Sequence, residues 1–107
     1  MAKSESIKQA LESIDSDFVR ALAEPVRIEL LRLLIVAGPS DVKTLAEQLP
    51  QDRSVISRHL ATLLNAGILR SAKQGRHVVY RIDGDAAIDK AEKLHQAMRR
   101  CVQLGCC

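Results

Sequence analysis

The feature that most constrains the fold of this chain is a change in the spacing of its apolar residues at Gly67. Before Gly67, apolar residues recur at steps of three and four, which is the period of an amphipathic helix. After it, residues 68–72 and 77–82 form two short segments suited to strands, and residues 73–76 form the turn between them. The sequence therefore predicts a helical first half followed by a β-hairpin.

The sequence predicts five helices, four before this hairpin and one after it. Pro25 suits a first turn, Gly38-Pro39 and Gly67 suit helix ends, and Ser40 suits an N-cap. The second helix is apolar nearly all round, which predicts a central position. The expected helices are residues 4–23 with a possible break at Asp15-Ser16, 25–37, 40–49, 53–65 and 84–104. The predicted fold is mainly α with a small β-hairpin, in the order α-α-α-α-β-β-α: a winged helix-turn-helix.

Positive charge is concentrated in residues 53–82, which contain six basic side chains and no acidic one. The whole chain carries 16 Lys and Arg against 13 Asp and Glu, so the remaining residues are net acidic. A basic stretch that spans a helix and a hairpin is typical of a nucleic-acid contact, because Lys and Arg displace the counterions of phosphates. A solvated surface without a partner is the alternative interpretation.

Composition excludes several other classes. With 107 residues, the chain is expected to form one domain, 1–107. Phe18 and Tyr80 are its only aromatic residues, which disfavours single-strand binding on stacking platforms. No apolar run approaches a membrane span and no signal peptide is recognisable, so we expect a cytoplasmic protein without a membrane partner. Outside residues 53–65 we find no nucleophile–base pair, and we find no phosphate loop or metal-water site that would indicate an enzyme. Ser57 and His59 are of catalytic type, but two residues apart on a helix they face different ways.

The helix at 53–65 is the expected recognition helix, which would enter the major groove of double-stranded DNA. Its polar side offers short donors and acceptors together with arginine, the side-chain types that reach base edges and phosphates. The turn of the hairpin would reach the backbone or the minor groove. The candidate DNA-binding residues are Arg53, Ser54, Ser57, Arg58, His59 and Thr62 on the helix and Lys73, Gln74 and Arg76 on the wing.

Three segments of the chain resemble the ArsR/SmtB family of bacterial repressors: ALAEPVRIELLRLL (21–34), SVISRHLATLLNAGILRS (54–71) and GRHVVYRI (75–82). The resemblance covers residues 17–83 closely. It implies a homodimeric repressor that leaves its operator when an inducer binds. It also implies a dimer interface built from the first and last helices, here residues 4–23 and 84–104.

The chain departs from that family at two known inducer sites. The founding members carry a Cys-Val-Cys motif before the recognition helix, where this chain has residues 41–45 without cysteine. Another family site uses Asp and His pairs on the last helix for Zn(II). That helix has Asp85, Asp89, Glu92 and His95 here, without a second histidine at the required spacing.

The cysteines, Cys101, Cys106 and Cys107, lie within seven residues of each other. In the reducing cytosol this cluster is not expected to be a structural disulfide framework. Three thiolates suit As(III) or Sb(III), whereas Zn(II) or Cd(II) would require a further ligand such as His95. We therefore expect As(III) or Sb(III) as the inducer, bound by these residues, which would alter the last helix and the spacing of the two recognition helices.

Three alternatives remain open at this stage. The cysteines could form a redox switch through a disulfide or persulfide, or bind Cd(II) or Zn(II), on the same DNA-binding repressor. They could belong to a thiol-rich metal-buffering protein that does not bind DNA. Cys101 could also be only a small core or interface residue.

Overall fold

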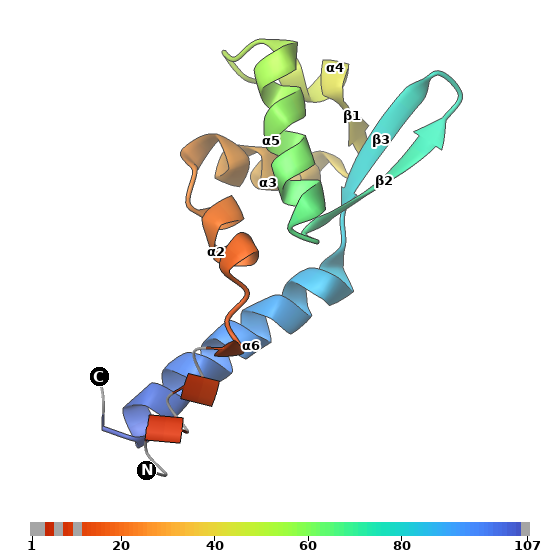
Figure 1. The fold of residues 1–107 in the computed structure, drawn as a ribbon. Coiled ribbons are helices and arrows are strands. Elements are labelled where there is room, and N and C mark those ends of the chain that lie inside the picture. The colour runs from red at the N-terminus through yellow and green to blue at the C-terminus, as the bar shows by residue number, and fades with distance from the viewer. Residues whose placement is uncertain (1–3, 6–7, 10–11, 106–107) are drawn as a thin grey trace.

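The computed structural model describes residues 4–5, 8–9 and 12–105. It is mainly helical, and its helix-helix-hairpin core confirms the predicted winged helix-turn-helix (Figure 1). The elements are α2 (Ser16–Leu22), α3 (Pro25–Ala37), β1 (Ser40–Asp41), α4 (Val42–Ala46), α5 (Arg53–Asn65), β2 (Leu69–Gln74), β3 (His77–Ile82) and α6 (Gly84–Gln103).

Several predicted helix boundaries are confirmed. The first predicted helix is interrupted at Asp15, whose carboxylate caps α2 by accepting a hydrogen bond from the backbone N–H of Phe18. Pro25 is the first residue of α3, where a missing N–H costs nothing. Gly67 follows α5 with φ at +76°, a conformation that residues with a Cβ adopt only at a cost.

The prediction for Ser40 was wrong. Ser40 donates its hydroxyl hydrogen to the carbonyl of Gly38 and lies in β1, while Asp41 caps α4 by accepting from the N–H of Thr44. Strand β1 pairs antiparallel with β3, so the sheet has three strands in the order β1-β3-β2 rather than two. Helix α4 ends at Ala46, three residues earlier than predicted.

The wing is a tight hairpin. Strands β2 and β3 pair from Leu69 opposite Ile82 to Gln74 opposite His77, so the turn is shorter than the predicted 73–76. Only Gly75 and Arg76 remain in it. Gly75 has φ at +63°, which matches the glycine required at the first position of a type II′ turn.

The core lies between α2, α3, α4, α5 and the base of the wing. Leu30, Ile56, Leu60 and Leu63 are completely buried there. Helix α3 was predicted to be central, but only part of it is. Its residues Ile35 and Val36 are 71% and 87% exposed, whereas their neighbour Leu34 is buried, so one side of α3 faces away from the core.

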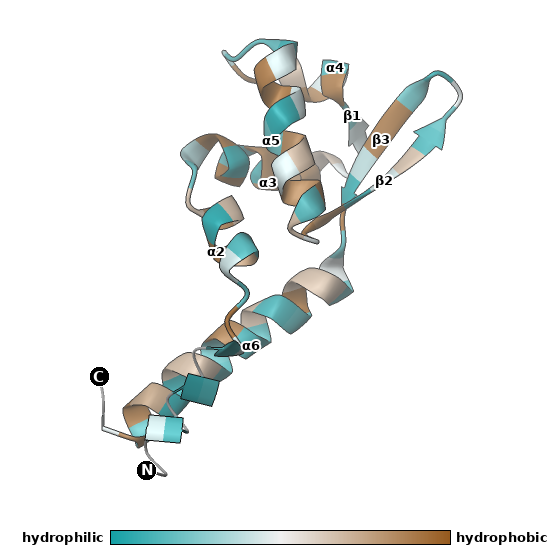
Figure 2. Ribbon diagram, in the orientation of Figure 1, coloured by the Kyte–Doolittle hydropathy of each residue, from teal (hydrophilic) through white to brown (hydrophobic). Residues whose placement is uncertain are grey.

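Helix α6 projects away from the winged-helix core (Figure 1). Ala97 is its one buried residue, and apolar and polar segments alternate along it (Figure 2). The radius of gyration, 16.8 Å, exceeds the roughly 13 Å of a compact chain of this size, because α6 extends the molecule to 56 Å. None of the described helices is long and apolar enough to span a membrane.

Candidate nucleic-acid interface

The recognition helix α5 has one buried and one exposed side. Ile56, Leu60 and Leu63 fix it to the core. On the other side Ser54, Arg58 and Thr62 follow one another at four-residue steps, so they form one exposed row along the helix. Ser57 is exposed beside this row. The structure thus brings together on one surface four residues that the sequence predicted as DNA contacts.

The N-terminus of α5 adds a second feature that suits DNA. Arg53, its first residue, is exposed, and the N-cap residue Asp52 makes no side-chain capping hydrogen bond. The first N–H groups of a helix have no partner within it and carry a partial positive charge, which favours a phosphate. Arg53 and these N–H groups can therefore bind the same DNA backbone.

Thr62 lies beside α2. Its hydroxyl donates to the carbonyl of Arg58 at 3.1 Å. It also lines a cavity of about 280 Å³ together with Asp17 and Arg20 of α2 and Asn65 of α5. Because its hydrogen is engaged within the helix, Thr62 can offer DNA only an acceptor.

His59 differs from the other predicted DNA contacts on α5. It is half-buried, and its Nδ1 atom lies 3.2 Å from Nη1 of Arg27 on α3. Sequence reasoning assigned no role to Arg27, which is one of three charged residues in α3. The environment of His59 thus depends on a residue 32 positions earlier in the chain.

The wing carries the remaining predicted contacts. Lys73 and Gln74 end β2 and Arg76 lies in the turn, and all three are exposed. At the base of the wing, Arg70 and Arg81 lie opposite each other across β2 and β3, and Arg70 lies 4.0 Å from Asp83. The tip is therefore basic and accessible, while part of the charge at the base is compensated.

The wing is attached to the start of α4 by a pair that the sequence did not reveal. Nδ1 of His77 lies 3.2 Å from Oδ2 of Asp41. Hydrogen bonds from Thr44 hold the pKa of Asp41 below its usual range, and the charges of His77 and Arg53 act in the same direction. Asp41 occupies the segment where the founding family members carry their cysteine motif, and its contacts here are structural.

The C-terminal end of α6 contains one described member of the predicted thiol cluster. Cys101 is half-buried and disulfide-bonded. Cys106 and Cys107 lie outside the described residues. Within residues 4–5, 8–9 and 12–105, no group of three or more His, Cys, Asp or Glu side chains is placed to hold a metal ion. His95 is exposed on α6, and Asp89 pairs with Lys93.

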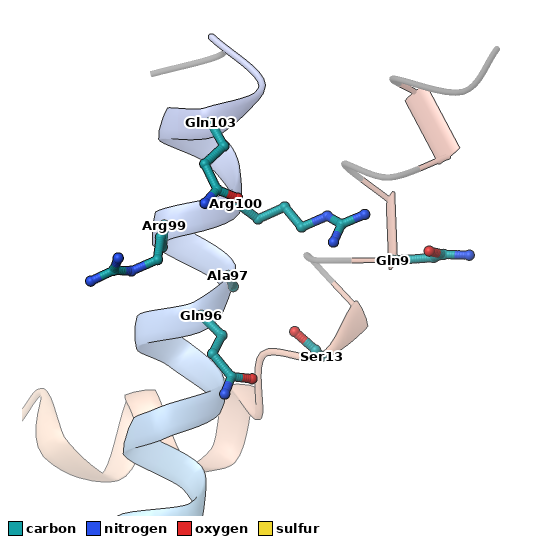
Figure 3. A pocket seen from close by; sticks show the side chains of 7 residues that line it. All are labelled: Gln9, Ser13, Gln96, Ala97, Arg99, Arg100 and Gln103. Atoms are coloured by element: carbon teal, nitrogen blue, oxygen red, sulfur yellow. The ribbon is translucent and has the colours of Figure 1, made fainter.

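A polar cavity lies between α6 and the N-terminal segment, close to Cys101 in sequence (Figure 3). Its volume is about 390 Å³. Arg100 reaches from α6 toward the N-terminal segment, whereas Arg99 extends from another side of the helix (Figure 3). The cavity is lined by Gln9, Ser13, Gln96, Ala97, Arg99, Arg100 and Gln103. Both segments predicted to form the dimer interface contribute to its lining.

Comparison with known proteins agrees with this geometry. A family model described as HVO_A0114 matches residues 19–86. The arsenical resistance operon repressor of Escherichia coli (strain K12) is 35% identical over 80 residues, which are 75% of this chain and 68% of that protein.

Solved structures of transcriptional regulators share this fold. An ArsR-like transcriptional regulator from Rhodococcus sp. RHA1 superposes with a TM-score of 0.73 at 28% identity, over 82% of this chain and 80% of that one. The homodimeric winged helix-turn-helix domain of Mb0332 from Mycobacterium bovis, a possible ArsR-family regulator, superposes with a TM-score of 0.63 at 26% identity, over 80% and 78%. These relatives are transcriptional regulators rather than enzymes. The chain belongs to the ArsR/SmtB family of winged helix-turn-helix transcriptional repressors.

Proposed function

We propose that this chain is a cytoplasmic, dimeric repressor, one domain per chain, that binds operator DNA through α5 and the wing. The observation that carries this proposal is the exposed polar and basic row of α5 beside a basic wing tip. The residues proposed to contact DNA are Arg53, Ser54, Ser57, Arg58 and Thr62 on α5 and Lys73, Gln74 and Arg76 on the wing. His59, which the sequence predicted as a base contact, is not among the residues proposed here to contact DNA.

The proposed dimer rests on α6. Ile88 and Met98 are each 59% exposed and Val102 is 68% exposed, which leaves the helix with uncovered apolar side chains. A second copy of α6 and of the N-terminal segment would cover them, and the similar domain of Mb0332 is homodimeric. The two-fold axis would then direct two α5 helices into successive major grooves, about 34 Å apart.

For the inducer, we propose As(III) or Sb(III) bound by Cys101, Cys106 and Cys107. The support for this site is the sequence, which places these three cysteines within seven residues, and reduction of the disulfide that Cys101 forms would be needed to free its thiol. Three thiolates from one short segment match the three-coordinate chemistry of these metalloids. Binding at the end of α6 would disturb the helix that we assign to the dimer, and a coupling of about 1–3 kcal/mol weakens DNA binding substantially.

The same disulfide also favours a second candidate, a redox switch. Oxidation of Cys101 would change the end of α6 without any metalloid. Induction by Cd(II) or Zn(II) is the third possibility and would need a fourth ligand. A metal-buffering protein without DNA binding is disfavoured by the family to which the chain belongs.

The test is fluorescence anisotropy of the reduced protein on DNA from its own promoter, with and without arsenite. We expect salt-dependent binding that arsenite abolishes, and a variant with all three cysteines changed to serine that binds DNA but ignores arsenite. Release of that variant by arsenite would disprove the thiol site. Release by oxidant alone, reversed by dithiothreitol, would select the redox switch.

A control on α5 separates DNA binding from induction. Arg58→Ala should weaken binding and lower the slope of log affinity against log salt by about 0.9 for each phosphate that the arginine neutralises. Arg32→Ala removes an exposed arginine on α3 that pairs with Glu29, and it should leave the affinity for DNA and its salt dependence unchanged. Equal effects of the two variants would argue against α5 as the DNA-reading surface.

A further inference from the structure

We propose that Arg27 is a positioning residue for DNA binding, which holds the recognition helix through His59 only while His59 is neutral. The inference rests on the DNA-binding role proposed for α5. It assigns His59 to the support of the helix rather than to the reading of bases.

Arg27 joins three helices. From the first turn of α3, its Nε donates to the carbonyl of Ala21 at 2.7 Å and its Nη2 donates to the carbonyl of Arg20 at 3.0 Å. Its Nη1 lies 3.2 Å from Nδ1 of His59 on α5. Helices α2, α3 and α5 contact one another in the structure. The guanidinium thus bonds the carbonyl of Ala21, adds a second hydrogen bond to the carbonyl of Arg20, which also accepts the N–H of Ala23, and reaches α5 with Nη1.

The chemistry of this contact fixes the state of His59. A guanidinium carries only donors and stays charged, so Nδ1 of His59 must accept. Nδ1 can accept only when it bears no proton, and the neutral ring then carries its hydrogen on Nε2. Arg27 therefore selects one tautomer of a neutral histidine.

Protonation would reverse the interaction. A proton on Nδ1 would remove the acceptor and leave two cations 3.2 Å apart between α3 and α5. Among the described residues, Asp17 and Arg20 of α2 line the cavity beside α5 with Thr62 and Asn65. Arg58 precedes His59 on α5, and Glu24 is the N-cap of α3, the helix that carries Arg27. These groups balance in charge, so with Arg27 the set stays positive and does not offset an added positive charge on His59.

This arrangement predicts the sign of a pH effect. A histidine that contacts DNA directly binds phosphates better when protonated, so acidification would strengthen binding. A histidine held by Arg27 loses its support when protonated, so acidification would weaken binding. Histidine side chains titrate between about pH 5 and 8, which makes the two cases easy to separate.

The experiment measures the affinity of the reduced, full-length protein for promoter DNA at pH 8 and pH 5.5 at constant ionic strength. The wild type should lose about tenfold in affinity at pH 5.5, the size expected for one hydrogen bond to a charged group. His59→Gln keeps an acceptor for Arg27 and cannot be protonated, so it should bind as the wild type does at pH 8 and stay constant. His95→Gln, exposed on α6, is the matched control and should retain the wild-type response.

A second variant tests Arg27 itself. Arg27→Met should bind about tenfold more weakly at pH 8 and show little further change at pH 5.5. Circular dichroism establishes whether this variant is folded, and His59→Gln provides the test if it is not.

Unchanged or tighter binding of the wild type at pH 5.5 would overturn the inference, as would a wild-type pH response in His59→Gln. Absence of DNA binding by the wild type at every pH would overturn the proposed function and this inference with it.

Discussion

The winged-helix core and helix α6 differ in how they bury apolar side chains. In the core, residues from five elements enclose Leu30, Ile56, Leu60 and Leu63 completely. Helix α6, although 20 residues long, buries only Ala97 and leaves Met98 and Val102 exposed. The core is therefore stabilised by many contacts within the chain, whereas the described residues cover little of the apolar surface of α6.

This difference suits an allosteric repressor. A rigid core keeps the DNA-reading row in one arrangement, and a helix with weak internal support can be moved by an inducer or stabilised by a partner at low cost. Four substitutions test whether the winged-helix core and α6 differ in this way, and their expected effects decrease from the first to the last.

The largest effect should come from the core. Leu60→Ala removes a fully buried side chain and should lower the free energy of unfolding by about 2–5 kcal/mol in urea denaturation. Val36→Ala, at an 87% exposed position of α3, should change it by less than about 0.5 kcal/mol. Similar losses in both variants would mean that α5 is not fixed by this core.

The next effect concerns α6. The double variant Met98→Glu, Val102→Glu should raise the dissociation constant of the proposed dimer about a hundredfold or more. Two substitutions in each chain would place four charged side chains in the interface instead of apolar ones. Sedimentation equilibrium measures this, with circular dichroism to verify that the core remains folded. Val36→Glu, at an exposed apolar position of α3, should leave the dimerisation unchanged. A dimer that tolerates both changes on α6 would require another interface.

The junction between the two regions should be less sensitive. Gly67 has φ at +76°, so Gly67→Ala should cost about 1–2 kcal/mol of unfolding free energy. An added Cβ would also lie 2.9 Å from Cε of Lys90 on α6, but this flexible side chain can move aside. Thermal unfolding measures the loss, and Gly84→Ala at an open position is the control. Equal stability of the two variants would contradict the strain at Gly67.

The smallest effect should come from the ion pair between Lys90 of α6 and Asp15, which is partly exposed. The hydrogen bond from Lys90, followed by that from the N–H of Phe18, holds the pKa of Asp15 below its usual 3.8. A lowered pKa stabilises the folded state above pH about 3.9, and this contribution is lost as the pH falls through the lowered value.

Asp15→Asn keeps the helix cap but removes the ion pair. Its destabilisation, measured by urea denaturation, should therefore be present at pH 7 and decline toward pH 2. A difference from the wild type that does not depend on pH would assign the role of Asp15 to capping alone.

The sequence predicted which residues of α5 share an exposed row, because that row depends on local spacing. Ser54, Arg58 and Thr62 share an exposed row for the same reason that Ile56 and Leu60 are buried, namely the helical period. The hairpin was predicted in the same way, from the strand-type spacing of its residues and from the glycine in its turn. Strand β1 was missed, since two residues carry no period and are a strand only through pairing with β3, about forty residues later.

The type and order of most elements, the concentration of positive charge and the exposed face of α5 follow from the sequence alone. Only the tertiary structure decided which side chains meet: Arg27 with His59, His77 with Asp41, and Lys90 with Asp15. The physical reason is that helical period, charge and turn chemistry act over a few residues, whereas these contacts are set by how distant elements pack against a shared core.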